Sequence, residues 1–143
     1  MRKKIVAGNW KMNNDLKATQ LLIEDLKGLT LASDVSAMVA PTFVNLTAAL
    51  DAAATTPIEV IAQNMHFADS GAYTGEISAD MLSAVGIKTV ILGHSERRSY
   101  FGETDEILAK KAKQAIDKGL QVMFCFGEEL ADRKSDNHFN VVE

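Results

Sequence analysis

Short apolar runs recur about every 30 residues along this chain, and amphipathic segments separate them, as in repeated βα units. The runs predict five strands, at residues 4–8, 35–40, 59–63, 88–92 and 121–126. Amphipathic segments between strands are typical of crossover helices that pack on a parallel sheet. The alternation therefore places the 143 residues in the α/β class.

The spacing of the apolar side chains supports the predicted helices. Two helices have an apolar face, formed by Leu22, Leu26 and Leu29 in the first and by Leu108, Ala112, Ala115 and Ile116 in a later one. Ser78 can cap a third helix, and Gly86 can end it in a left-handed conformation. We expect this third helix to bury Met81, Leu82 and Val85.

Two architectures are compatible with this repeat. An eightfold (β/α)8 barrel of about 250 residues has the same repeat, and five strands are too few to close it. A small doubly wound sheet of five strands fits equally well, so the pattern alone does not choose between them. Because no linker or low-complexity stretch divides the chain, residues 1–143 are predicted to form a single domain.

The charge pattern argues against a nucleic-acid partner. The net charge of −4 comes from 19 acidic and 15 basic residues that are spread along the chain. Two basic clusters, Lys110-Lys111-Lys113 and Arg97-Arg98, lie among carboxylates, so we expect them on solvated helix faces with local ion pairs.

Two further features of the sequence bear on membrane binding and on cysteine chemistry. No apolar run approaches the ~20 residues of a membrane helix, so no membrane partner is expected. The single cysteine, Cys125, allows no disulfide within the chain and no metal-binding or redox pair, which fits a reducing cytoplasm.

Ligands of parallel α/β folds bind at the carboxyl ends of the strands, so polar residues there are the first candidates for chemistry. Asn9 and Lys11 follow the first strand and suit an anionic or carbonyl-bearing ligand, although a lone lysine is more often a surface residue. His94 follows the fourth strand directly. A following helix would favour its neutral, hydrogen-bond-donating form, although it could also only satisfy local backbone groups.

Two further strand-end segments have more than one interpretation. Glu96 could be a general acid or base, a partner for Lys11, or a residue that favours the start of a helix. The two glycines of residues 71–76 permit a tight protruding turn that exposes Tyr73 and Thr74, as an ordinary loop or as a docking element.

Five segments together resemble the triosephosphate isomerase family, in that family's order and spacing. They are Gly8-Asn9-Trp10-Lys11-Met12-Asn13, Ala62-Gln63-Asn64, Gly71-Ala72-Tyr73-Thr74-Gly75-Glu76, Gly93-His94-Ser95-Glu96-Arg97-Arg98 and Cys125-Phe126-Gly127-Glu128. The resemblance covers essentially the whole chain and implies the first five βα units of a TIM (β/α)8 barrel. It also implies a cytoplasmic enzyme of glycolysis and gluconeogenesis.

The resemblance implies interconversion of dihydroxyacetone phosphate and glyceraldehyde 3-phosphate through an enediolate, without a metal or an organic cofactor. His94 is then expected to donate a hydrogen bond to the carbonyl oxygen, and Lys11 to stabilise negative charge on the substrate. Asn9 would orient the substrate and position Lys11. Ser95 and Glu96 are expected to support His94 and Lys11 without contacting the substrate themselves.

The resemblance also carries expectations about assembly. In the family, the 71–76 turn inserts into a neighbouring subunit, so a homodimer with Thr74 at the contact is expected. The family's proton-abstracting glutamate follows the sixth strand, which this sequence does not reach. Residues 1–143 are therefore expected to be inactive alone and to need a complementing C-terminal half barrel. The alternative is a non-catalytic α/β module that acts in binding or assembly.

Overall fold

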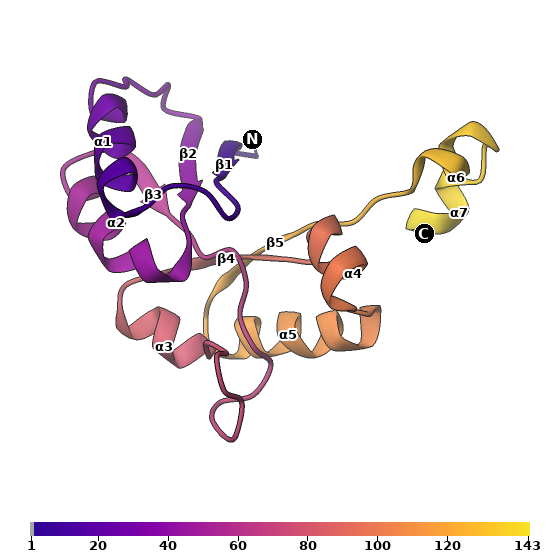
Figure 1. Ribbon diagram of the computed structural model, residues 1–143. Helices are drawn as coiled ribbons and strands as arrows, with labels where there is room; N and C mark the ends of the chain where they lie inside the picture. Colours follow the sequence, from indigo (N-terminus) through magenta and orange to yellow (C-terminus); the bar gives the residue numbers. More distant parts are fainter. Residues whose placement is uncertain (1) are drawn as a thin grey trace.

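The computed structural model describes residues 2–143 as five parallel strands, each followed by one or two helices (Figure 1). The strands are β1 (Lys4–Asn9), β2 (Val35–Ala40), β3 (Ile58–Val60), β4 (Thr89–Leu92) and β5 (Gln121–Phe124). The helices are α1 (Leu16–Leu26), the 3-10 helix η1 (Phe43–Asn45), α2 (Leu46–Ala53), α3 (Ala79–Ala84), α4 (Ser95–Phe101), α5 (Asp105–Asp117), α6 (Leu130–Lys134) and α7 (His138–Val142). The predicted α/β class with five βα units is confirmed. That they form one domain stays a prediction.

The strands follow one another in space in the order of the sequence. One sheet has the order β1-β2-β3, and a second sheet pairs β4 with β5, with every pair parallel. Ala62, just beyond β3, forms a parallel bridge with Val90 of β4 and so connects the two sheets. This order has no reversal, whereas a doubly wound sheet reverses its strand order at a switch point. The arrangement is that of an incomplete barrel, and the described strands do not close on themselves.

The outer edges of β1 and β5 have no strand beside them within residues 2–143. Side chains on both strands are correspondingly open to solvent, with 52% of Ile5, 66% of Val6 and 44% of Phe124 exposed. Unpaired backbone groups next to exposed apolar side chains are a template for further strand pairing.

Three strands are shorter than predicted: β4 begins at Thr89, one residue later than expected, and β3 and β5 end early. The third strand ends at Val60 and not at residue 63. The chain bends there, so that Ala62 no longer pairs with β2 and instead pairs with Val90 of β4. The fifth strand ends at Phe124 and not at residue 126. Its neighbour β4 ends at Leu92, because the following Gly93 is left-handed (φ +80°).

The inner strands β2, β3 and β4 bury side chains on both of their faces, in two separate apolar clusters. The larger cluster lies between the strands and the helices, and its members include Ile23, Val39, Val60, Leu82, Val90, Leu92 and Ala115. The smaller cluster lies on the opposite face of the strands and contains Met38, Ala40, Ile61 and Ile91. The alternation of neighbours such as Met38 and Val39 between the clusters follows the two-residue period of a strand.

Helix α3 begins where predicted but buries partly different residues. Ser78 caps α3 by accepting a hydrogen bond from the N–H of Met81. Of the residues predicted to be buried there, only Leu82 is, while 55% of Met81 and 41% of Val85 are exposed. A six-residue helix turns one narrow stripe towards the core, and Met81 and Val85 lie together, one turn apart, outside it.

The apolar faces of α1 and α5 were also predicted only in part. Helix α1 ends at Leu26, which leaves Leu29 outside it, and Thr19 and Ile23 are its buried residues. In α5, Leu108 and Ala115 are buried as predicted, but 66% of Ile116 is exposed.

Lys111 of α5 is buried, contrary to the prediction of a solvated lysine cluster. Its Nζ donates to Glu103 Oε1 at 2.6 Å and to Asn64 Oδ1 at 2.9 Å, and Arg97 Nε donates to the same Glu103 oxygen at 2.6 Å. Burial by itself raises the pKa of Glu103, but the hydrogen bonds from Lys111 and Arg97 outweigh it and hold this pKa below its usual value. The lysine is buried because its charge is paired.

Replacing Glu103 by Gln should lower the free energy of unfolding by about 3–5 kcal/mol, because it leaves the buried Lys111 charge without a carboxylate. The measurement is urea unfolding near neutral pH. Asp117→Asn is the matched control, since it breaks the exposed Lys113–Asp117 pair of the same helix and should cost less than about 1 kcal/mol. Equal losses in the two variants would show that burial does not determine the strength of the pair.

The same network predicts a sign for the acid response. Because the pKa of Glu103 is lowered on folding, its stabilisation is present above its unfolded-state pKa of about 4.3 and is lost as the pH falls towards the folded-state pKa. Stability measured between about pH 5 and pH 3 should therefore fall less steeply in Glu103→Gln than in the unsubstituted chain. Parallel curves would contradict this account.

Candidate active site

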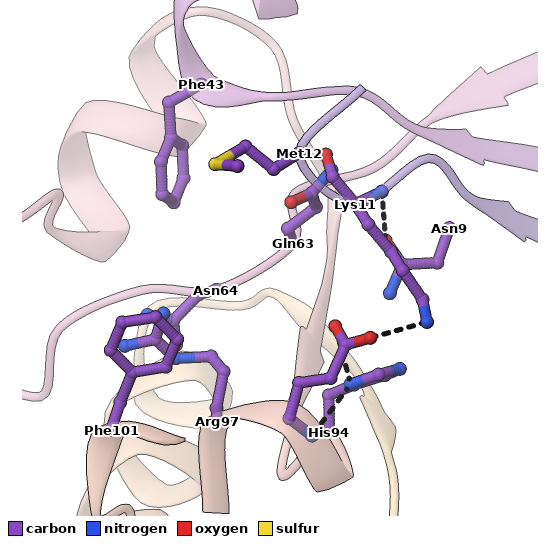
Figure 2. Close-up of a pocket in the computed structure, with 10 residues that line it drawn as sticks. Asn9, Lys11, Met12, Phe43, Gln63, Asn64, His94, Arg97 and Phe101 are labelled. Carbon is purple, nitrogen blue, oxygen red and sulfur yellow. Dashed lines mark hydrogen bonds and ion pairs between the residues drawn. The ribbon is translucent and has the colours of Figure 1, made fainter. Parts of the chain in front are cut away.

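A cleft of about 190 Å³ lies at the carboxyl ends of β1, β3 and β4 (Figure 2). It is lined by Asn9, Lys11, Met12, Phe43, Gln63, Asn64, His94, Glu96, Arg97 and Phe101. Parallel strands end together at one edge of the structure, which brings residues that are up to 92 positions apart around one hollow.

Lys11 has an unusual backbone conformation, with φ of +54° in a residue that is not glycine. Neighbouring amides support this turn. Asn9 Oδ1 accepts the N–H of Lys11 at 3.0 Å, and Gln63 Nε2 donates to the carbonyl oxygens of Lys11 at 2.9 Å and Ala40 at 2.8 Å. A left-handed non-glycine residue is strained and persists where its surroundings fix it. The ends of β2 and β3 thus set the position of Lys11.

The side chain of Lys11 reaches across the cleft to α4. Its Nζ lies 2.5 Å from Glu96 Oε1, and 50% of the Lys11 side chain and 38% of the Glu96 side chain are exposed. The hydrogen bond from Lys11 lowers the pKa of Glu96, so this carboxyl stays ionised at neutral pH. A pair this exposed contributes little to stability. What it does is hold the ammonium group over the cleft.

His94 caps the N-terminus of α4. Its Nδ1 accepts the backbone N–H of Glu96 at 3.3 Å and lies 3.5 Å from Glu96 Oε2 (Figure 2). A ring nitrogen that accepts a hydrogen bond carries no proton, so this contact assigns the proton of the neutral ring to Nε2. The imidazole therefore has a hydrogen-bond donor left for a ligand.

Gly93 determines how His94 leaves the strand. Its φ is +80°, and a Cβ at this position would come within 2.5 Å of the carbonyl oxygen of Cys125. A side chain would therefore clash with backbone in a conformation that L-residues rarely adopt. Arg98 Nε also donates to the Gly93 carbonyl at 2.8 Å, which fastens the turn to α4.

The structure brings four of the predicted site residues together: Asn9, Lys11, His94 and Glu96. Ser95 borders a neighbouring cleft of about 310 Å³, which it shares with His94 and Cys125. Thr74 lies on the exposed 71–76 loop and does not line the first cleft. Of the three interpretations left open for Glu96, the contact with Lys11 and the place in the first turn of α4 are both present.

Sequence reasoning did not assign a role to Gln63, although this residue holds the Lys11 turn. Its position directly after an apolar run was the available signal, since polar residues at strand ends face the ligand edge. The contributions of Phe43 and Phe101 to the cleft had no such signal, because they come from separate helices.

Chemically, the cleft combines a lysine ammonium with an imidazole N–H. Fixed donors of this kind stabilise negative charge that develops on a carbonyl oxygen. Among residues 2–143, no three His, Cys, Asp or Glu side chains are grouped so that they could hold a metal ion. None of the described helices is both long and apolar enough to span a membrane.

Comparison with known proteins gives the same family throughout. The family model for triosephosphate isomerase matches residues 4–143. The triosephosphate isomerases of Flavobacterium psychrophilum and Flavobacterium johnsoniae are 56% and 54% identical to this chain over 144 residues, and that of Clostridium beijerinckii is 48% identical over 143 residues. Each alignment covers the whole chain but only 58% of the relative.

The five βα units therefore correspond to part of a longer protein in these relatives, which agrees with an incomplete barrel. The match extends over nearly all of the described residues and includes every strand. The chain belongs to the triosephosphate isomerase family.

Proposed function

We propose that the protein formed with these 143 residues interconverts dihydroxyacetone phosphate and glyceraldehyde 3-phosphate through an enediolate. The observation that carries this proposal is the shared cleft in which Glu96 contacts both Lys11 and His94. The relatives that match the whole chain are triosephosphate isomerases, which supports the same substrate class. The proposal concerns a whole enzyme, because this chain aligns with only 58% of the length of its relative.

The proposed roles follow from the charge and hydrogen-bonding capacity of each group. Lys11 is the fixed positive charge that attracts the anionic substrate and stabilises negative charge on the enediolate. His94 donates its Nε2 proton as a hydrogen bond to the reacting carbonyl oxygen. Asn9 orients the substrate and, through its contact with the Lys11 N–H, keeps Lys11 in place.

Glu96 and Ser95 are proposed to support these groups without carrying the proton. Glu96 holds the ammonium of Lys11 and, through its backbone N–H, selects the tautomer of His94. Its lowered pKa argues against a role as proton donor at neutral pH. Ser95 follows His94 directly at the start of α4 and is assigned the same supporting role by the family resemblance.

The proton-abstracting base is proposed to lie outside residues 1–143. The family resemblance places that glutamate after a sixth strand, and no glutamate of this sequence stands in the corresponding motif. A complementing half barrel would pair with the open edges of β1 and β5 and supply this base. Residues 1–143 alone are accordingly proposed to have little or no isomerase activity.

A homodimer through the 71–76 loop is proposed as well. All six loop residues are exposed. Three apolar side chains elsewhere are also exposed, with exposed fractions of 93% for Met12, 87% for Val44 and 55% for Met81. Apolar side chains exposed to this degree favour burial against a partner. In the proposed dimer, Thr74 approaches Asn9 and Lys11 of the second copy. A cytoplasmic location is proposed because Cys125 is the only thiol.

The alternative function is a non-catalytic module that binds or assembles through its sheet edges. The exposed side chains of Val6 and Phe124 on the two outer strands favour it. The two functions differ in whether a complement creates turnover.

Purified residues 1–143 should show no turnover of glyceraldehyde 3-phosphate above background, because a positioned general base contributes on the order of 10²- to 10⁴-fold. Adding a polypeptide that supplies strands six to eight of a relative should create activity. His94→Gln in the complemented enzyme should lower kcat by about 10²- to 10³-fold, because it replaces a fixed imidazole donor.

The His94→Gln chain, prepared identically, is also the control for contamination by a host isomerase. Turnover by the unsubstituted chain alone that disappears in this variant would place a base within the chain or its oligomer and contradict the proposal. Assembly with the complement that yields no turnover would favour the non-catalytic module.

Thr74→Arg should weaken self-association by about tenfold or more, since it places a bulky charge at the proposed contact. Sedimentation over a range of concentrations measures the effect. Thr55→Arg is the matched control, because Thr55 is exposed in the turn after α2 and outside the proposed contact. If both substitutions leave the dissociation constant unchanged, the dimer does not use the 71–76 loop.

A further inference from the structure

His66 packs against two aromatic rings at the base of the 71–76 loop. Its ring centroid is 4.2 Å from that of Phe67 and 4.2 Å from that of Tyr73, with interplanar angles of 30° and 44°. Only 14% of the His66 side chain is exposed. The Phe67 and Tyr73 centroids lie 6.2 Å apart, so the three rings form one cluster, and the mostly buried imidazole gives the Tyr73 ring a surface to pack on.

The same histidine also contacts the far end of the loop. Its Nδ1 lies 3.6 Å from Glu76 Oε2, and its backbone N–H donates to the carbonyl oxygen of Ile77 at 2.8 Å. His66 therefore meets the loop at its middle, through Tyr73, and at its end, through Glu76 and Ile77. These contacts close the loop on itself.

The loop backbone folds tightly around Tyr73. The N–H of Tyr73 donates to Gly71 at 2.9 Å, and the N–H of Glu76 donates to the Tyr73 carbonyl at 3.0 Å. Gly71 has φ of +139°, and a Cβ there would come within 2.9 Å of the Tyr73 ring. Two turns of the loop therefore meet at Tyr73, and the first leaves no room for a side chain at position 71.

The other charged groups near this cluster have partners of their own. Asp69 binds Lys118 at 2.8 Å and Gln114 at 2.6 Å, while Lys110 lies over the Phe67 ring at 5.7 Å. Among the described residues, Glu76 is the carboxylate that lies within 4.0 Å of a ring nitrogen of His66. The polar contact of His66 is consequently specific to the loop.

We propose that His66 is a positioning residue that orders the 71–76 loop before it binds a second copy of this chain. The inference rests on the dimer of the proposed function. An exposed loop with left-handed glycines loses much conformational entropy when it docks, and ordering it beforehand reduces this loss. His66 provides the order through a ring contact on Tyr73 and a polar contact on Glu76.

The test is hydrogen exchange of the Tyr73 and Glu76 amides in the full chain, with sedimentation on the same samples. His66→Ala should speed exchange at both amides by about tenfold, the loss expected for an aromatic contact, and should weaken self-association by a similar factor. His138→Ala is the matched control. This histidine also packs on a phenylalanine, with its centroid 4.3 Å from that of Phe139, but it lies in α7.

Two further variants separate the contacts. His66→Phe keeps a ring against Tyr73 and loses the polar contact, so it should recover most of the protection, whereas His66→Gln should resemble His66→Ala. The amides of Leu82 and Val90, which lie in the core, should exchange as in the unsubstituted chain in every variant.

The outcomes distinguish this inference from the proposed dimer. Unchanged exchange at Tyr73 and Glu76 in His66→Ala would overturn the inference, and so would a loss of protection that extends to Leu82 and Val90. If the unsubstituted chain does not self-associate, the proposed dimer fails. The exchange rates would still show whether His66 orders the loop.

Discussion

The parallel bridge between Ala62 and Val90 is the contact on which the candidate site depends. It joins the sheet of β1, β2 and β3 to the pair β4 and β5, with backbone hydrogen bonds of 3.0 Å and 2.8 Å on its two sides. Lys11 comes from the first sheet and His94 from the second. Without the bridge the two sheets would not share an edge, and the ammonium group and the imidazole would have no common cleft.

Helix α4 connects two ion pairs of opposite character. Glu96, in its first turn, forms an exposed pair with Lys11, and Arg97, the next residue, contacts the buried pair of Glu103 and Lys111. An exposed pair contributes little to stability, whereas a buried pair is costly to break. The buried pair therefore holds α4 in place through Arg97, and the exposed pair positions the Lys11 ammonium group where a substrate can reach it. Adjacent residues of α4 thus have different roles: Glu96 positions a charge, and Arg97 contributes to stability.

The sequence predicted those parts of the structure that depend on local pattern. Apolar runs located all five strands, and polar residues after them located Asn9, Lys11 and His94, because strand ends meet at one edge. Long-range contacts were harder to predict. The burial of Lys111 depends on Asn64 and Glu103, which lie 47 and 8 residues away. No helical periodicity indicates such a partner, so the lysine resembled its exposed neighbours.

The sequence by itself determined the α/β class, the strand ends that carry the polar groups, and the left-handed Gly86 that follows α3. These features follow from hydrophobic periodicity and backbone sterics, which act over a few residues. Only the tertiary structure decided between a barrel-like order and a doubly wound sheet, since both use the same βα repeat. It also decided that Glu96 contacts Lys11 and that Gln63 holds the Lys11 turn. These contacts span 85 and 52 residues, and folding brings them together only when the strands align in register.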